Sequence, residues 1–213
     1  MDLLLFIPVL LISIVAHEVA HAWQARREGD RTAEDLGRIT LNPLAHLDLM
    51  GSFLVPALLY AGGGILFGWA RPVPVDPSRF RSHPLSDIRV SLAGIVANLL
   101  LVLVFGLIGA LLLGALRPFP AAQSAVWTVA TTGMFLNLVL ALFNLLPIPP
   151  LDGSHVVAQF LPARWAVPYQ RLGAIGLLVL MAAAWVVPGL MRAALGPAEW
   201  VMGIGVAWLR LWQ

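Results

Sequence analysis

Residues 3–25 read LLLFIPVLLISIVAHEVAHAWQA, an apolar segment that is interrupted by His17, Glu18 and His21. A helix of this length can cross about 30 Å of hydrocarbon, where ionisable side chains are costly and usually mark a functional site. Residues four apart share one helix face, so His17 and His21 can bind one metal ion. Glu18 lies in the same sector, close enough to act on a metal-bound water. The segment therefore predicts a membrane helix that carries a metal centre.

This spacing is the H-E-x-x-H pattern, in which two histidines hold zinc and the glutamate acts as general base. The alternative is a pair of helix histidines bonded to neighbouring groups, with Glu18 paired to one of them. A cleaved secretory leader is a further alternative, because residues 20–22 fit a small-x-small cleavage site. Asp2, however, stands where such a leader carries Lys or Arg. We therefore expect the segment to stay in the protein as a span.

The composition is that of an integral membrane protein. Of the 213 residues, 60% are hydrophobic and only 11% are charged, whereas soluble domains carry about 25% charged residues. The net charge of +2 is small, and the basic residues lie between apolar runs, which favours orientation in a lipid bilayer over nucleic-acid binding. The chain has no Cys, so a metal site must use His, Asp or Glu.

The apolar runs predict an all-α polytopic membrane protein with about five to six membrane segments, forming one domain over residues 1–213. The core covers residues 3–155, and C-terminal helices follow over 156–213. Full spans are expected at residues 3–25, 90–114, 125–146 and 172–190. Residues 198–212 carry three tryptophans and are short for a span, so they either cross or lie at the interface.

A re-entrant or extended, β-like element is expected between the first and second full spans. Residues 51–68 are apolar, but Pro56 and the run Gly62-Gly63-Gly64 interrupt a helix there. Residues 69–77 contain three prolines, which favour extended chain.

A catalytic zinc site needs three protein ligands and one open position. Asp152 is the preferred third ligand because it follows three prolines, which break the helix, and precedes Gly153, which permits close backbone approach. An ordinary Asp-Gly turn at the membrane surface is the alternative. Glu199 is the rival ligand, although no comparable backbone signal precedes it. His46 and Asp48 can also ligate metals, but a turn near the Asn-Pro pair explains them better.

This third ligand constrains the topology. If the first span and span 125–146 both end on the metal side, then span 90–114 begins there. The intervening residues 26–89 must start and end on one side, so the 51–68 element dips in and returns. This arrangement puts ten arginines on the metal side: Arg26, Arg27, Arg31, Arg38, Arg71, Arg79, Arg81, Arg89, Arg164 and Arg171. Arg117 and Arg192 lie opposite, so the positive-inside rule makes the metal side cytoplasmic.

Five stretches of the chain resemble the site-2 protease family of zinc intramembrane metalloproteases, in its compact subgroup without PDZ or CBS domains. They are His17-Glu18-Val19-Ala20-His21, Gly37-Arg38-Ile39-Thr40-Leu41-Asn42-Pro43, Phe67-Gly68-Trp69-Ala70-Arg71-Pro72-Val73-Pro74-Val75, Ala93-Gly94-Ile95-Val96-Ala97-Asn98 and Asn144-Leu145-Leu146-Pro147-Ile148-Pro149-Pro150-Leu151-Asp152-Gly153. Two positions depart from the family pattern: Ile95 replaces a usual Pro and Ser154 replaces a common second Gly.

The resemblance implies that His17, His21 and Asp152 bind one zinc ion per chain and that Glu18 is the catalytic base. It also implies that Asn98 helps to position the substrate and that the stretch 67–75 lies near the substrate path. The residues alone would instead favour an Asn98 bonded between helices. Asn144 either braces the broken helix or faces the substrate. His155 remains unassigned.

We therefore expect a multi-pass cell-membrane endopeptidase that cleaves within or beside a transmembrane segment of another membrane protein, with its active site open to the cytoplasm. The alternative is a membrane metal transporter or a catalytically silent adaptor. A transporter needs ligands but no proton-transfer carboxylate beside them, which is why Glu18 favours the enzyme. A regulatory partner supplied in trans remains open.

Overall fold

The structure is a computed structural model, and it describes residues 3–48, 54, 71–186 and 188–212. Regular structure in these residues is helical, and no strand occurs among them. The predicted re-entrant element at residues 51–68 lies outside the described residues, apart from residue 54.

Three long helices form the centre of the fold: α1 (Leu3–Glu28), α4 (Leu85–Ala115) and α5 (Pro120–Leu145). Each is long and apolar enough to cross a membrane, and they coincide with the predicted spans 3–25, 90–114 and 125–146. The all-helical membrane architecture is therefore confirmed. The total of five to six membrane segments stays a prediction.

Prolines set the boundaries of α5. Pro120 occupies its first turn, where a missing backbone N–H costs nothing. The helix ends at Leu145, just before Pro147, and the chain then runs through three prolines to α6 (Asp152–Ala158). The Asp-Gly pair thus starts a short helix.

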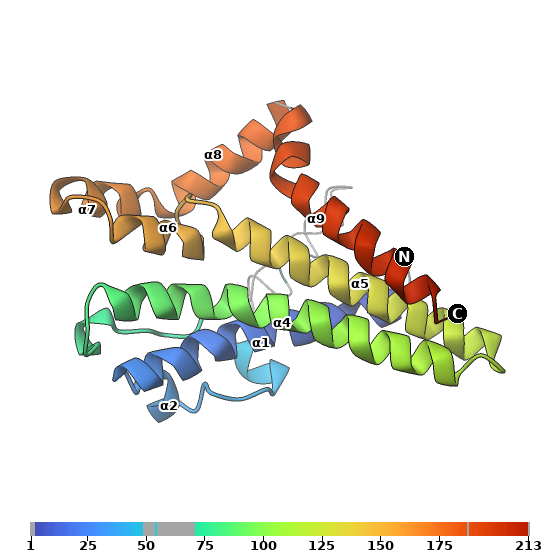
Figure 1. Cartoon of the computed structure of the whole chain (residues 1–213). Coiled ribbons are helices and arrows are strands. Elements are labelled where there is room, and N and C mark those ends of the chain that lie inside the picture. The colour runs from blue at the N-terminus through green and yellow to red at the C-terminus, as the bar shows by residue number, and fades with distance from the viewer. Residues whose placement is uncertain (1–2, 49–53, 55–70, 187, 213) are drawn as a thin grey trace.

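Beyond α6 the chain forms α7 (Ala163–Arg171), α8 (Gly173–Val186) and α9 (Pro188–Arg210). The span predicted at 172–190 falls on α8, which has 14 residues, and on the start of α9; its crossing of the membrane stays a prediction. Residues 198–212, which were expected either to cross or to lie at the interface, fall mostly within α9, and the choice between the two stays open. Figure 1 shows α8 rising away from the bundle and α9 returning along α5.

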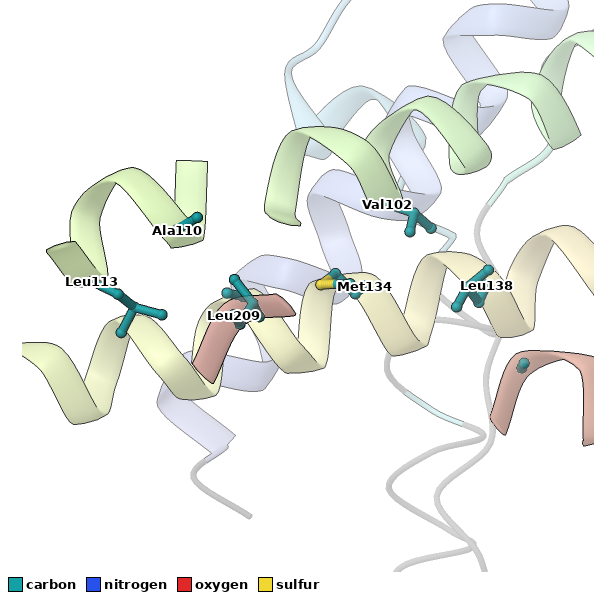
Figure 2. Packing of buried hydrophobic residues seen from close by; sticks show 8 residues of the cluster. Val102, Ala110, Leu113, Met134, Leu138 and Leu209 are labelled. Atoms are coloured by element: carbon teal, nitrogen blue, oxygen red, sulfur yellow. The ribbon is translucent and has the colours of Figure 1, made fainter. Parts of the chain in front are cut away.

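The three long helices pack against one another, and α9 adds to the core on α5. Figure 2 shows Leu113 of α4 and Leu209 of α9 in one row with Met134 of α5. Small residues allow this close approach: a Cβ atom on Gly109 would lie 2.5 Å from that of Ala130. Small residues at helix crossings are typical of membrane bundles, where packing rather than water exclusion drives association.

The opposite face of α4 is apolar and exposed, as expected for a surface that meets lipid tails. Its large exposed residues include Val96, Leu99, Leu100, Leu103, Val104, Leu107, Ile108, Leu111 and Leu112.

The C-terminal end of α1 lies beside the N-terminal end of α4 (Figure 1). The Arg81 backbone N–H donates to the Glu28 carbonyl at 2.9 Å, and Ser86 Oγ donates to Glu28 Oε2 at 2.7 Å. The connection between the two helices therefore starts and ends at one end of the bundle, as the topological argument requires. It contains α2 (Thr32–Asp35) and the short 3-10 helices η1 (Pro43–His46) and η3 (Pro77–Arg79).

Candidate metal centre

Three side chains from two distant parts of the chain meet at one point. His17 and His21 lie one turn apart on α1, and their Nε2 atoms are 3.0 Å apart. Asp152, the first residue of α6, places Oδ2 at 3.2 Å from His17 Nε2 and 3.3 Å from His21 Nε2. Sequence reasoning proposed these three residues as one set, and the structure brings them together.

Gly153 makes this meeting possible. A Cβ atom on Gly153 would lie 2.3 Å from the Leu145 carbonyl oxygen, a separation that no side chain tolerates. Only glycine lets the start of α6 fold back against the end of α5.

The remaining nitrogen of each histidine is already bonded. His17 Nδ1 donates to Asn98 Oδ1 at 2.6 Å, and His21 Nδ1 donates to the Val90 carbonyl at 2.7 Å. A neutral imidazole carries one proton, so both Nε2 atoms present lone pairs toward each other and toward a carboxylate. Such outer hydrogen bonds are typical of metal-binding histidines.

These donor atoms fit zinc. Asp152 Oδ2 is buried and lacks a hydrogen bond of normal geometry, although it lies near two nitrogens. Three converging lone pairs repel one another unless a cation lies between them. A tetrahedral zinc site with bonds of about 2.0–2.1 Å places its ligand atoms about 3.3–3.4 Å apart, close to the separations found here.

Glu18 lies beside these atoms without belonging to the donor set. Its Oε2 accepts a hydrogen bond from the Val73 backbone N–H at 2.8 Å. The residue that sequence reasoning assigned as the base is therefore held by the backbone of residues 71–76. This contact joins residues that are 55 positions apart, and no sequence pattern indicates it.

Residues 71–76 carry no regular secondary structure and are held by polar groups from the α1–α4 connection. The buried Arg38 donates to the Arg71 carbonyl at 2.9 Å. The buried Asp30 accepts from the Asp76 N–H at 2.7 Å. Hydrogen bonding from Ser78 lowers the pKa of Asp76, so its carboxylate stays ionised near neutral pH. The segment is thus fixed along its length beside Glu18.

A cavity of about 390 Å³ opens at these groups. Its walls include Glu18, the three donor residues, Asn144 and His155. Asn144 Nδ2 donates to the Leu140 carbonyl at 3.0 Å, so this side chain both braces the last turns of α5 and borders the cavity. The space is large enough for a short stretch of peptide and several waters.

Asn98 is placed differently from Asn144. It is fully buried, and its side chain forms hydrogen bonds with His17, Asn137 and Ser13. The role in substrate positioning that the resemblance implies stays a prediction, and the contacts in the structure place Asn98 behind a zinc-ligand candidate.

The rival metal ligands lie outside the donor cluster. Glu199 is exposed on α9. His46 is buried in η1, where Nε2 donates to the Thr40 carbonyl at 2.9 Å. Asn42 caps this same turn by accepting from the Leu44 N–H, which supports the turn interpretation of the Asn-Pro stretch. In the described part of the chain, the one group of potential metal donors includes neither Glu199, His46 nor Asp48.

Sequence reasoning missed the part that Gly94 plays. A Cβ atom at this position of α4 would lie 2.4 Å from His21 Nε2 and 2.5 Å from His17 Cε1. The sequence does hold one indication of this role: Gly94 lies in an apolar span, four residues before Asn98. Glycine in such a span is typical of a close helix crossing. Gly94 leaves the room that the two imidazole rings occupy.

Gly94→Ala is expected to reduce zinc binding by at least about tenfold, because the methyl group displaces both rings from their shared point. Gly106→Ala on the same helix is the matched control, since its Cβ meets nothing closer than 3.6 Å. Zinc per chain, measured by elemental analysis of both purified variants, checks the prediction. Equal zinc content in the two variants would contradict it.

Comparison with known proteins gives one family. A model described as Peptidase family M50 matches residues 5–119 and 115–187. YwhC of Bacillus subtilis, named as a candidate zinc metalloprotease, is 39% identical over 177 residues, which cover 81% of this chain and 76% of YwhC.

Two mycobacterial proteins with the same kind of name are also similar. Rip2 of Mycolicibacterium smegmatis is 35% identical over 178 residues, covering 80% of this chain and 64% of Rip2. Rip3 of Mycobacterium tuberculosis is 32% identical over 209 residues, covering 94% of this chain and 41% of Rip3. The chain thus spans less than two thirds of these two relatives. No solved structure matches it.

Proposed function

Because this chain belongs to peptidase family M50, the site-2 protease family of zinc metalloendopeptidases, we propose that it cleaves a peptide bond within or beside a transmembrane helix of another membrane protein. One observation carries the proposal: the candidate zinc donors and Glu18 line a single cavity, and α1, which supplies three of these four residues, is long and apolar enough to span a bilayer. A soluble peptidase has no need to place such groups on an apolar helix.

His17, His21 and Asp152 would hold the zinc ion, which when bound acidifies coordinated water and polarises a carbonyl group. Asn98 and the Val90 carbonyl fix the orientation of the two imidazole rings through their Nδ1 protons. The three donor residues line the cavity, from which water and a substrate carbonyl would reach them.

Glu18 is the proposed general base. It takes a proton from the attacking water as the new C–O bond forms, and it delivers that proton to the amide nitrogen as the C–N bond breaks. The Val73 N–H binds Glu18 Oε2 at 2.8 Å. This hydrogen bond fixes the orientation of the carboxylate, and Oε1 remains available to accept a proton.

A helical substrate hides its carbonyls in internal hydrogen bonds, so it must unwind before cleavage. Pro72, Val73 and Val75 line the cavity beside Glu18, and backbone without regular secondary structure can pair with an unwound strand where it is extended. Asn144 borders the same cavity and is the better placed of the two asparagines to contact a substrate directly.

The cytoplasmic opening of the site is supported by charge. Arg26 and Arg27 occupy the last turn of α1, close to the end of the bundle where α4 begins. Arg31, Arg38, Arg79, Arg81 and Arg89 follow in the same connection or the first turns of α4. This excess of positive charge near the metal centre favours the cytoplasmic side.

The test uses the purified protein in liposomes together with two model single-span substrates. One substrate helix carries a Gly-Pro pair at its centre and the other carries Leu-Leu. We expect the Gly-Pro helix to be cut faster, because it unwinds at lower cost, and mass spectrometry should place the cut within or beside the apolar segment. A zinc chelator should stop cleavage, and added zinc should restore it.

Cleavage that is confined to soluble peptides would contradict the proposal. Zinc uptake into the liposomes without any cleavage would instead support a metal transporter, and bound zinc with neither activity would support a silent adaptor.

A further inference from the structure

A chain of buried amide and hydroxyl groups runs from the candidate metal centre across three helices. Ser13 of α1, Asn98 of α4 and Asn137 of α5 are each fully buried. Asn98 Nδ2 donates to Asn137 Oδ1 at 2.7 Å, and Asn137 Nδ2 donates to Ser13 Oγ at 2.8 Å. Asn137 lies outside the stretches that carry the family resemblance, and its side chain bonds to Ser13, Asn98 and Gly133 rather than to a proposed zinc ligand.

The donor-to-acceptor direction of these hydrogen bonds is fixed, because backbone carbonyls can only accept hydrogen bonds. Asn137 Nδ2 also donates to the Gly133 carbonyl at 2.8 Å, so the amide nitrogen of Asn137 must face that carbonyl. Its oxygen therefore faces Asn98. Ser13 Oγ in turn donates to the Val9 carbonyl at 2.7 Å, which leaves its oxygen free to accept from Asn137.

The orientation of the Asn137 amide determines that of the Asn98 amide, which contacts His17. Since Asn137 presents an oxygen, Asn98 turns its Nδ2 toward α5 and its Oδ1 toward His17. An oxygen at this place requires a proton on His17 Nδ1, so the lone pair of His17 lies on Nε2. A second carbonyl, that of Ser13, accepts from Asn98 Nδ2 at 3.5 Å, a longer and weaker contact than the bond to Asn137.

We propose that Asn137 is a positioning residue: by presenting Oδ1 to Asn98, it keeps the proton of His17 on Nδ1 and the Nε2 lone pair available for zinc. The inference rests on the proposed zinc site. A purely structural role is the competing explanation, because a buried amide that bonds α1, α4 and α5 together also stabilises the bundle.

The two explanations differ for one conservative change. Asn137→Asp keeps an oxygen that accepts from Asn98 Nδ2, but it removes the amide protons that bond Ser13 and Gly133. Asn137→Leu removes the acceptor as well. If Asn137 acts through the direction of the Asn98 amide, then the Asp variant keeps its zinc affinity although its melting temperature falls, and only the Leu variant loses affinity.

The experiment measures the zinc dissociation constant by competition with a fluorescent chelator, together with the melting temperature of each purified, detergent-solubilised variant. Asn137→Leu should bind zinc about ten- to a hundredfold more weakly, as is usual when an outer partner of a metal-binding histidine is lost. Asn137→Asp and Ser13→Ala should stay within about threefold of the wild type, because both keep an oxygen toward Asn98.

Thr131→Val is the matched control. It lies on α5, and its hydroxyl donates to the Trp127 carbonyl within the same helix, away from the metal centre. Affinity should be unchanged in this variant.

Equal affinity in Asn137→Leu and Thr131→Val would overturn the proposal, as would affinity that falls in step with the melting temperature across all variants. If Asn137→Leu does not fold, the test rests on Asn137→Asp. Loss of zinc affinity in Asn137→Asp would contradict the inference. A wild-type protein that binds no zinc would refute the metal centre itself, which is a separate outcome.

Discussion

Glu18→Gln is expected to keep its zinc and to lower the rate of peptide-bond cleavage by about 10²- to 10⁴-fold, the usual contribution of a general base. Glutamine has nearly the size of glutamate, and its amide oxygen can still accept from the Val73 N–H, which holds Glu18 Oε2 at 2.8 Å. The fold and the donor set therefore persist, but the side chain can no longer take a proton from water. Cleavage of the Gly-Pro substrate in liposomes, with zinc measured on the same preparation, checks both parts.

Glu34→Gln is the matched control for this change. Glu34 forms ion pairs with Arg26 and Arg31 in the α1–α4 connection, away from the cavity, so its substitution should leave the rate within about twofold, since such pairs contribute little. Wild-type activity in Glu18→Gln would remove Glu18 as the base. Loss of zinc in that variant would instead show that Glu18 helps to hold the metal.

Asp152→Ala is expected to lose most of its zinc. The wild-type protein should contain about one zinc ion per chain, because three donors and one open position form a catalytic site. Removal of Asp152 leaves only the two histidines on α1, and we expect the affinity to fall by more than about 100-fold, beyond the usual effect of losing an outer-shell partner. Elemental analysis of detergent-purified protein measures the difference.

The rival ligand supplies the control. Glu199→Ala alters an exposed carboxylate on α9 that lies outside the donor cluster, so it should keep wild-type zinc content. Zinc retained in Asp152→Ala and lost in Glu199→Ala would reverse the assignment of the third ligand, and the topology built on Asp152 would then fall with it.

The long helices and the donor set could be predicted because each leaves a local mark in the sequence. Apolar length marks α1, α4 and α5, and the four-residue spacing of His17 and His21 places both on one helix face. The three prolines before Asp152 mark the point where α5 must end. These features depend on neighbours along the chain, which hydropathy and backbone chemistry describe well.

The contacts that complete the site could not be predicted, because they depend on how the helices cross. The bond from the Val73 N–H to Glu18 and the fit of two imidazole rings over Gly94 join residues that are far apart in sequence. The same holds for Asn137, whose bond to Asn98 depends on how α5 packs against α4. Whether residues 172–190 and 198–212 cross the membrane stays a prediction, because mean apolarity alone does not decide it.

The proposed zinc ligands are far apart in sequence, so they are synthesised at different times. His17 and His21 are made first, whereas Asp152 follows α4 and α5, and chains are made and folded from the N-terminus. If Asp152 closes the site as proposed, a ribosome-bound chain has no complete metal centre until the first three long helices have all been inserted. The unfinished protease then cannot cut the helices that enter the membrane beside it, and a chain released early stays inert.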